Sequence, residues 1–181
     1  GARVEVNGCD LFTFRDGKLK LAKQSEPLDI RWSRPLPEGV DPSQVTVSRD
    51  AAGRWFVSLL VEETITPYAP TDAAVGLDVG ITTLATLSTG EKITNPKHEK
   101  KDRAKLAKAQ RNMARKQKGS NNRAKARLKV AKVYARIADR RRDHLHKLTT
   151  RIVRENQTIV IEDLTVHNMV KNRSLARAIS D

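Results

Sequence analysis

The sequence has little of what would cross-link a chain or hold it through a metal. Its 181 residues contain a single cysteine, Cys9, so no internal disulfide can form, and no CxxC pair is present to build a zinc site. No run of 18 apolar residues occurs, and the first residues lack the basic-then-apolar pattern of a signal peptide. We therefore expect no zinc site and no membrane partner, and a cytoplasmic protein stabilised by an apolar core.

Acidic residues are also few relative to basic ones. The chain has 35 Lys and Arg against 21 Asp and Glu, a formal net charge of +14. Residues 97 to 154 carry 22 basic and 4 acidic residues, a net charge of +18, so the rest of the chain sums to −4. Because this basic segment has helical composition, we expect a helical surface that binds a polyanion.

The chain begins without a methionine and stops at Asp181, directly after the helix-like run SLARAIS. We interpret it as a piece of a longer polypeptide, the full-length parent.

Residues 1 to 70 contain short alternating apolar runs separated by turn residues, a pattern that predicts a small antiparallel β-barrel. The runs span residues 3–6, 11–14, 18–21, 28–32, 44–47 and 55–61. We expect Trp32, Trp55 and Phe56 in the core of this barrel, with an aromatic platform for stacking nucleobases as the alternative. Two prolines in TPYAPTD, residues 66 to 72, are typical of a linker.

The remaining residues alternate between strand and helix patterns. Strands are predicted over residues 73–79, 81–88 and 91–94, a helical hairpin over 96–155 with its loop at 118–122, a strand over 157–164, and a final helix from about 165 or after 172. In the hairpin we expect an apolar seam of Leu106, Ala109 and Met113 facing a stripe on the second helix, composed of Leu128, Ala131, Ala135, Ala138, Leu145, Leu148 and Ile152. Because the helical crossover is long, the strand at 158–162 can lie parallel to the strand at 74–78 in one sheet.

Each of these two strands carries one carboxylate near its carboxyl end. Asp78 shares its strand face with Gly76 and Gly80, and Glu162 faces away from Ile159 and Ile161, which we expect in the core. Two neighbouring carboxylates are stabilised by a divalent cation such as Mg²⁺, which prefers oxygen ligands. The alternative is structural: an Asp at a strand end caps a turn, and the Glu162-Asp163 pair begins the next helix.

Three motifs in this order resemble the OrfB/TnpB proteins of IS200/IS605-type transposons. They are the strand VGLDVGITTLATLS, the basic helix RRRDHLHKLTTRIV and the strand IVIEDL, followed by SLARAISD. The resemblance implies an α/β fold with an RNase H-like, RuvC-type mixed sheet in residues 71–181, preceded by a wedge-like β-barrel segment in residues 1–70. It also implies that Asp78 and Glu162 are catalytic and bind Mg²⁺ or Mn²⁺.

The resemblance further implies RNA-guided DNA cleavage, with DNA and a guide RNA as partners, in the nucleoid of a prokaryotic cell. Members of the family also have an N-terminal helical region, a four-cysteine zinc ribbon and a third catalytic Asp, all absent from this sequence. Asp181 matches an Ile-Ser-Asp motif that is not the third catalytic position. We therefore expect the piece alone to be inactive as a nuclease.

The basic hairpin has few aromatic residues, which favours contacts with phosphates over base stacking. The expected contacts lie around its loop and are Arg111, Arg115, Lys116, Lys118, Arg123, Lys125 and Arg127. His144 and His146 are two apart, which does not suit a metal pair on a helix, so we expect them to pack or to contact phosphates.

Two other functions fit parts of the sequence. The GLDVGITT strand also resembles the first phosphate loop of the actin and sugar-kinase ATPases, although a second glycine-rich loop is missing. Alternatively, the protein is a non-catalytic nucleic-acid-binding module of a mobile element.

Overall fold

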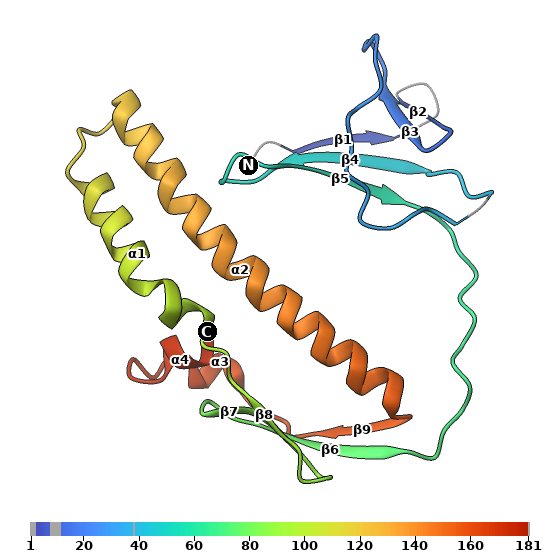
Figure 1. Cartoon of the computed structure of the whole chain (residues 1–181), viewed down its shortest axis with the longest axis vertical. Helices are drawn as coiled ribbons and strands as arrows, with labels where there is room; N and C mark the ends of the chain where they lie inside the picture. Colours follow the sequence, from blue (N-terminus) through green and yellow to red (C-terminus); the bar gives the residue numbers. More distant parts are fainter. Residues whose placement is uncertain (1–2, 8–11, 38, 181) are drawn as a thin grey trace. The chain divides into compact units, whose positions relative to one another are not determined.

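The computed structural model describes residues 3–7, 12–37 and 39–180, and Cys9 and Asp181 lie outside these residues. The chain divides into two compact units, Gly1–Pro67 and Tyr68–Asp181. The first consists of small antiparallel sheets, and the second of a mixed sheet with a helical hairpin (Figure 1).

The first unit contains five strands in two separate sheets. Strands β1 (Arg3–Asn7), β4 (Gln44–Arg49) and β5 (Trp55–Leu60) form an antiparallel sheet in the order β1-β4-β5, and β2 (Phe12–Arg15) pairs with β3 (Lys18–Leu21). Within the described residues these sheets do not close into the expected barrel. The predicted strand at residues 28–32 is also wrong, since that segment has no regular strand structure. Its start is fixed instead by the Leu28 N–H, which donates to the Leu19 carbonyl at 2.7 Å.

The core of the first unit does not contain the predicted tryptophans. Phe12, Leu19 and Val45 are buried there, and Val57 of β5 packs against them. The prediction that Trp32, Trp55 and Phe56 form this core is wrong, because their exposed fractions are 38%, 61% and 47%. Alternation explains Phe56: its neighbour Val57 takes the inward position on β5, so Phe56 faces the other side.

The second unit is built on a four-stranded mixed sheet in the order β8-β7-β6-β9. Strands β6 (Ala74–Val79), β7 (Thr83–Leu87) and β8 (Lys92–Thr94) form an antiparallel meander. Strand β9 (Thr158–Ile161) lies parallel to β6, with pairs from Ala74↔Thr158 to Leu77↔Ile161. The predicted parallel pairing across the helical crossover is therefore confirmed.

The crossover is a hairpin of two helices, α1 (His98–Ala114) and α2 (Asn121–Glu155), as Figure 1 shows. The Ser120 hydroxyl accepts the Arg123 N–H at 3.2 Å and caps α2. Gly119 turns the chain into this cap with φ of +82°, which only glycine adopts without strain.

A thin apolar seam holds the two helices together. The predicted side on α1 is confirmed, because Leu106 is buried with Ala109 and Met113 packed around it. The predicted stripe on α2 is wrong in part: Leu128, Ala138 and Leu145 are exposed, whereas Ile152 is buried as expected. The α2 residues that are buried with Leu106 are Val130, Val133 and Ile137. They also have spacings of three and four, so periodicity alone did not distinguish them from the predicted stripe.

The far end of α2 packs on the sheet, where Ile152 forms a cluster with Val75 and Leu87. The prediction that Ile159 and Ile161 are core residues is wrong, since they are 37% and 66% exposed. Their strand β9 lies at the edge of the described sheet, which explains the exposure. The chain continues into two short helices, α3 (Val166–Met169) and α4 (Ala176–Ser180). Among the described residues no helix is both long and apolar enough to cross a membrane.

Candidate functional site

Asp78 and Glu162 lie at the same end of two adjacent parallel strands. The last pair between β6 and β9 is Leu77↔Ile161; Asp78 is the next residue of β6, and Glu162 directly follows the end of β9. If this register continued by one residue, the two carboxylates would lie side by side at the spacing of neighbouring strands, about 4.8 Å, with side chains toward one face. Both residues are exposed. Open α/β sheets commonly place binding sites at this carboxyl end.

The face that carries Asp78 also presents groups that the sequence reasoning missed. Asp78 is paired with Thr86 on β7, and Thr86 is paired with Lys92 on β8. Cross-strand partners share a face, so Lys92, Thr86 and Asp78 form one row across the sheet. Because neighbouring residues of a strand face opposite sides, an inward-facing Ile93 predicts that Lys92 faces the other side, where the carboxylates lie. The sequence therefore contained a signal for the position of Lys92.

The donor set limits the kind of metal that this end of the sheet could hold. No group of three or more His, Cys, Asp and Glu side chains gathers in the part of the chain that the structure describes. The two carboxylates from adjacent strands would provide oxygen ligands only. The remaining coordination positions of a bound metal ion would be filled by water or by substrate oxygens. Such a set suits Mg²⁺ or Mn²⁺ and does not suit zinc. The role of Asp78 and Glu162 as metal ligands and catalytic residues remains a prediction.

The two glycines that flank Asp78 differ in what they do. A Cβ at Gly80 would lie 2.9 Å from the Thr83 carbonyl oxygen, whereas a Cβ at Gly76 would meet the Ser88 Cβ at 3.4 Å. The Gly80 N–H also donates to the Leu84 carbonyl at 3.2 Å, which closes the β6–β7 turn. Gly80 is thus required by the turn that follows Asp78, and Gly76 occupies a site where a methyl group fits.

Gly80→Ala is expected to destabilise the protein by about 1–3 kcal/mol, because the added methyl group must displace backbone. Gly76→Ala is the matched control and should change stability by less than about 1 kcal/mol, since only a side chain must adjust. Thermal and denaturant unfolding of the two variants provide the comparison. Equal stability of Gly80→Ala and wild type would contradict this description of the turn.

The predicted phosphate contacts cluster around the tip of the helical hairpin. Arg111 lies in the last turn of α1, Lys116 and Lys118 lie in the loop, and Lys125 lies in the first turns of α2; all four are exposed. Arg115 and Arg127 are exposed as well. These six exposed cations lie in the loop or in the adjoining parts of the two helices, and their contacts with nucleic acid remain a prediction.

Arg123 differs from the other predicted contacts. Its guanidinium donates to the carbonyl oxygens of Met113 and Lys116 at 3.2 and 2.8 Å, where α1 ends. The Met113 carbonyl also accepts the Lys116 N–H at 3.1 Å, so the guanidinium adds a second donor there and complements the negative end of the helix dipole. The geometry therefore assigns Arg123 a part in closing the hairpin tip.

Polar and aromatic contacts fix the register of the hairpin near its base. Arg140 of α2 donates to the buried Asp102 of α1 at 2.7 Å. His98 lies one turn before Asp102 in α1, and His144 lies one turn after Arg140 in α2. Their rings pack edge to face with centroids 5.9 Å apart. The expected packing role of His144 is therefore confirmed.

Glu99 joins the C-terminal helix α4 to the start of α1. Its carboxylate accepts Nε of Arg177 at 3.1 and 3.0 Å and a guanidinium N–H of Arg103 at 3.2 Å. The hydrogen bonds from Arg177 lower the pKa of the Glu99 carboxyl below its ordinary value, against an opposing effect of burial, and Arg103 adds to the lowering. The Glu99 side chain is only 13% exposed, so this cluster is shielded from solvent on one side.

Acid should weaken this connection. Because the folded state lowers the pKa of Glu99, its stabilising contribution is complete above the unfolded value of 4.5 and disappears as pH falls through the lower folded value. Glu99→Gln should therefore remove part of the acid-induced loss of stability below about pH 4.5. The control is Glu91→Gln, which breaks the exposed ion pair of Glu91 with Arg151. This variant should lose stability in acid almost as wild type does. Identical pH dependence of Glu99→Gln and wild type would contradict the role given to Glu99.

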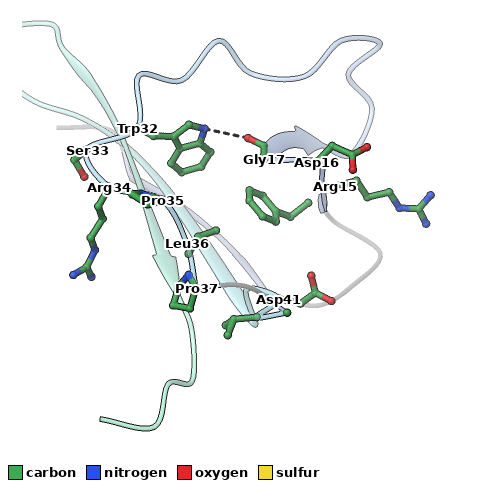
Figure 2. Close-up of a pocket in the computed structure, with 13 residues that line it drawn as sticks. Arg15, Asp16, Gly17, Trp32, Ser33, Arg34, Pro35, Leu36, Pro37 and Asp41 are labelled. Carbon is green, nitrogen blue, oxygen red and sulfur yellow. Dashed lines mark hydrogen bonds between the residues drawn. The ribbon is translucent and has the colours of Figure 1, made fainter. Parts of the chain in front are cut away.

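The first unit contains a cavity of about 840 Å³ beside Trp32 (Figure 2). The indole N–H of Trp32 donates to the Gly17 carbonyl at 3.0 Å, which fixes the ring (Figure 2). Arg15 and Arg34 extend away from Trp32 in Figure 2, and Asp16 and Asp41 on the same lining offset their charge. An exposed, fixed indole is compatible with the base-stacking alternative, which remains a prediction, but the balanced charge gives no preference for a phosphate.

Together these features define a class of protein: a basic α/β protein whose mixed sheet presents two strand-end carboxylates and whose helical crossover carries most of the positive charge. A family model described as a probable transposase, OrfB of IS605, matches residues 56–173. The chain belongs to this OrfB family of IS605-type transposon proteins.

Individual relatives carry consistent names. A protein of Streptomyces pristinaespiralis named "Putative RNA-guided DNA endonuclease" is 74% identical over 170 residues, covering 94% of this chain and 42% of the relative. The Escherichia coli K12 protein "Putative RNA-guided DNA endonuclease InsQ" is 44% identical over 129 residues, 71% of this chain and 32% of the relative. A Mycobacterium tuberculosis protein with the same type of name is 31% identical over 121 residues. The chain spans less than half the length of these relatives.

Proposed function

We propose that this chain is part of a transposon-encoded, RNA-guided DNA endonuclease, to which it contributes two metal-binding carboxylates and a nucleic-acid-binding hairpin. The observation that carries the proposal is the parallel β6–β9 pairing, which brings Asp78 and Glu162 to one end of the sheet from positions 84 residues apart. The names of the relatives support DNA cleavage as the reaction. The net charge of +18 in residues 97–154 supports a nucleic acid as the substrate.

The same proposal includes an RNase H-like, RuvC-type fold for the second unit. Its support is the sheet order β8-β7-β6-β9, in which an antiparallel meander is followed by a helical crossover to a strand parallel to β6. The crossover is the basic hairpin itself, so one element joins the two carboxylate strands and carries the charge that attracts nucleic acid.

In the proposed site, Asp78 and Glu162 would hold Mg²⁺ or Mn²⁺ through their carboxylate oxygens. A divalent ion bound there would stabilise the attacking and leaving oxygens of a phosphodiester during hydrolysis. The chain's own contribution would be positional: the parallel strands bring the two carboxylates to one end of the sheet, and Gly80 keeps the turn beyond Asp78 tight. Lys92, in the same row, adds a positive charge on the face where the phosphate backbone would lie.

DNA and a guide RNA are the proposed partners of the basic surface. Lysine and arginine bind phosphates without regard to sequence, which suits a protein that leaves sequence recognition to base pairing with a guide. The exposed cations at the hairpin tip and the scarcity of aromatic residues there favour recognition of backbone over recognition of bases.

The test is programmed cleavage by the full-length parent. With a guide RNA that matches a plasmid target and with Mg²⁺ present, we expect double-strand cleavage at the target; with a mismatched guide or with a chelator we expect none. Binding without cleavage under all these conditions would favour the non-catalytic nucleic-acid-binding module. Stabilisation of the protein by ATP, with no cleavage, would favour the ATPase.

A further inference from the structure

A second cavity, of about 320 Å³, lies within the unit Tyr68–Asp181, between the start of α1 and the C-terminal helix. Four cationic side chains line it, those of Lys97, Lys100, Arg103 and Arg177, and Glu99 is the one carboxylate among its lining residues. The formal charge of the lining is therefore +3. The cavity beside Trp32 is larger, but its lining has no net charge. The smaller cavity is therefore the better candidate for binding an anion.

The two arginines of this cavity are held in place by the chain. Glu99 binds both Arg103 and Arg177, so two guanidiniums from different segments converge on one carboxylate. Side chains that are already fixed lose less conformational entropy when they bind a ligand. Lys97 begins α1 with φ of +48°, and the Asn95 side chain accepts its N–H at 2.9 Å, which fixes the backbone from which this lysine extends.

The cavity lies at the same end of the sheet as the two carboxylates. Strands β6, β8 and β9 run in the same direction, so their carboxyl ends meet at one edge. Asp78 and Glu162 lie at this edge, and so does Ile81, which lines the cavity three residues after Asp78. The Asn95 amide donates to the Ile81 carbonyl at 3.0 Å and thereby ties the turn after β6 to the start of the cavity wall.

We propose that this cavity binds one backbone phosphate of the nucleic-acid strand that passes Asp78 and Glu162. The ligand class is a phosphodiester, because a cavity of this size lined by four cations favours a compact anion, and Arg and Lys are the side chains that bind phosphate oxygens. This inference rests on the proposed function for the identity of the strand, but the phosphate site itself does not require that the protein cuts DNA. By anchoring a phosphate beside the carboxylates, the cavity sets the register of the strand relative to them.

The test removes the two lysines and retains the Glu99 cluster, so that the fold is preserved. Lys97→Gln with Lys100→Gln should weaken binding of the chain to a 12-nucleotide single-stranded DNA several-fold, and lower the slope of log affinity against log salt by about 1. The control is Lys18→Gln with Lys20→Gln, which removes the same charge from the β2–β3 hairpin and should leave the slope unchanged. Equal slopes for the cavity variant and wild type would overturn the proposal.

A set of modified oligonucleotides makes the test specific for one phosphate. Each carries a single neutral methylphosphonate at a different position. For wild type, we expect one position, or two adjacent positions, at which the substitution weakens binding most. In the Lys97→Gln, Lys100→Gln variant that position should show no further loss, because both changes remove the same contact. Additive losses at every position would contradict a shared contact.

Failure of this inference and failure of the proposed function give different results. If the full-length parent cuts guided targets but the cavity variant binds and cuts as wild type does, the endonuclease stands and the phosphate site is wrong. If the parent never cuts, while the variant loses salt slope and the position-specific effect, the phosphate site stands and the endonuclease is wrong.

Discussion

Asp78→Ala in the full-length parent is expected to lower the rate of guided DNA cleavage by about 10³-fold or more, with little change in affinity for guide RNA or target. The carboxylate lies at the end of β6 and makes no part of the basic surface, so its loss should affect the chemical step and not binding. Glu162→Ala should give the same loss. Single-turnover cleavage and separate measurement of target affinity distinguish the two effects.

Asp163→Ala is the matched control for Glu162→Ala. It removes a carboxylate from the adjacent position, whose strand parity is opposite, and should leave the cleavage rate within a few-fold of wild type. Normal cleavage by either Asp78→Ala or Glu162→Ala would reject the site. A comparable loss in Asp163→Ala would show that the register of β9 does not select the functional carboxylate.

Neutralising the hairpin tip is expected to produce the largest loss of binding. Replacing Arg111, Arg115 and Lys118 with Gln should lower the salt slope by about 2 to 3 and weaken affinity for nucleic acid on the order of 10²-fold at about 0.1 M salt. All three residues are exposed, so the fold should persist, which thermal unfolding can verify.

Two comparisons test whether this effect belongs to the tip. The control variant replaces Lys18, Lys20 and Lys23 with Gln and so removes the same charge from the first unit. It should leave the slope of log affinity against log salt nearly unchanged. Arg123→Ala should act differently: because its guanidinium bonds Met113 and Lys116 carbonyls, the expected result is a loss of stability of about 1–3 kcal/mol. If the two triple variants weakened binding equally, the tip would not be a specific surface.

The sequence predicted the arrangement of the second unit because long-range order there follows from simple rules. A strand, a meander and a long helical crossover leave few options for the next strand, so the β6–β9 pairing could be expected before the structure. The position of Gly80 in a tight turn, in contrast, depends on the approach of the Thr83 carbonyl, which no residue pattern reveals.

Surface and core were harder to separate where two faces carry similar residues. On α2, the exposed Leu128 and Leu145 and the buried Val130 and Ile137 all have helical spacing, and only contact with α1 decides between them. In the first unit, Trp32, Trp55 and Phe56 were expected inside, yet Phe12, Leu19 and Val45 fill the core. The Glu99 cluster could not be predicted because Arg177 is 78 residues away in the chain.

The central claim is that Asp78 and Glu162 share one divalent ion. The most direct measurement is a crystal structure of the full-length parent with Mn²⁺, in which anomalous scattering locates the metal. The account predicts a peak within about 2.0–2.3 Å of a carboxylate oxygen from each residue, on one face of the sheet. A peak bound by only one of them, or side chains of Asp78 and Glu162 on opposite faces, would contradict it.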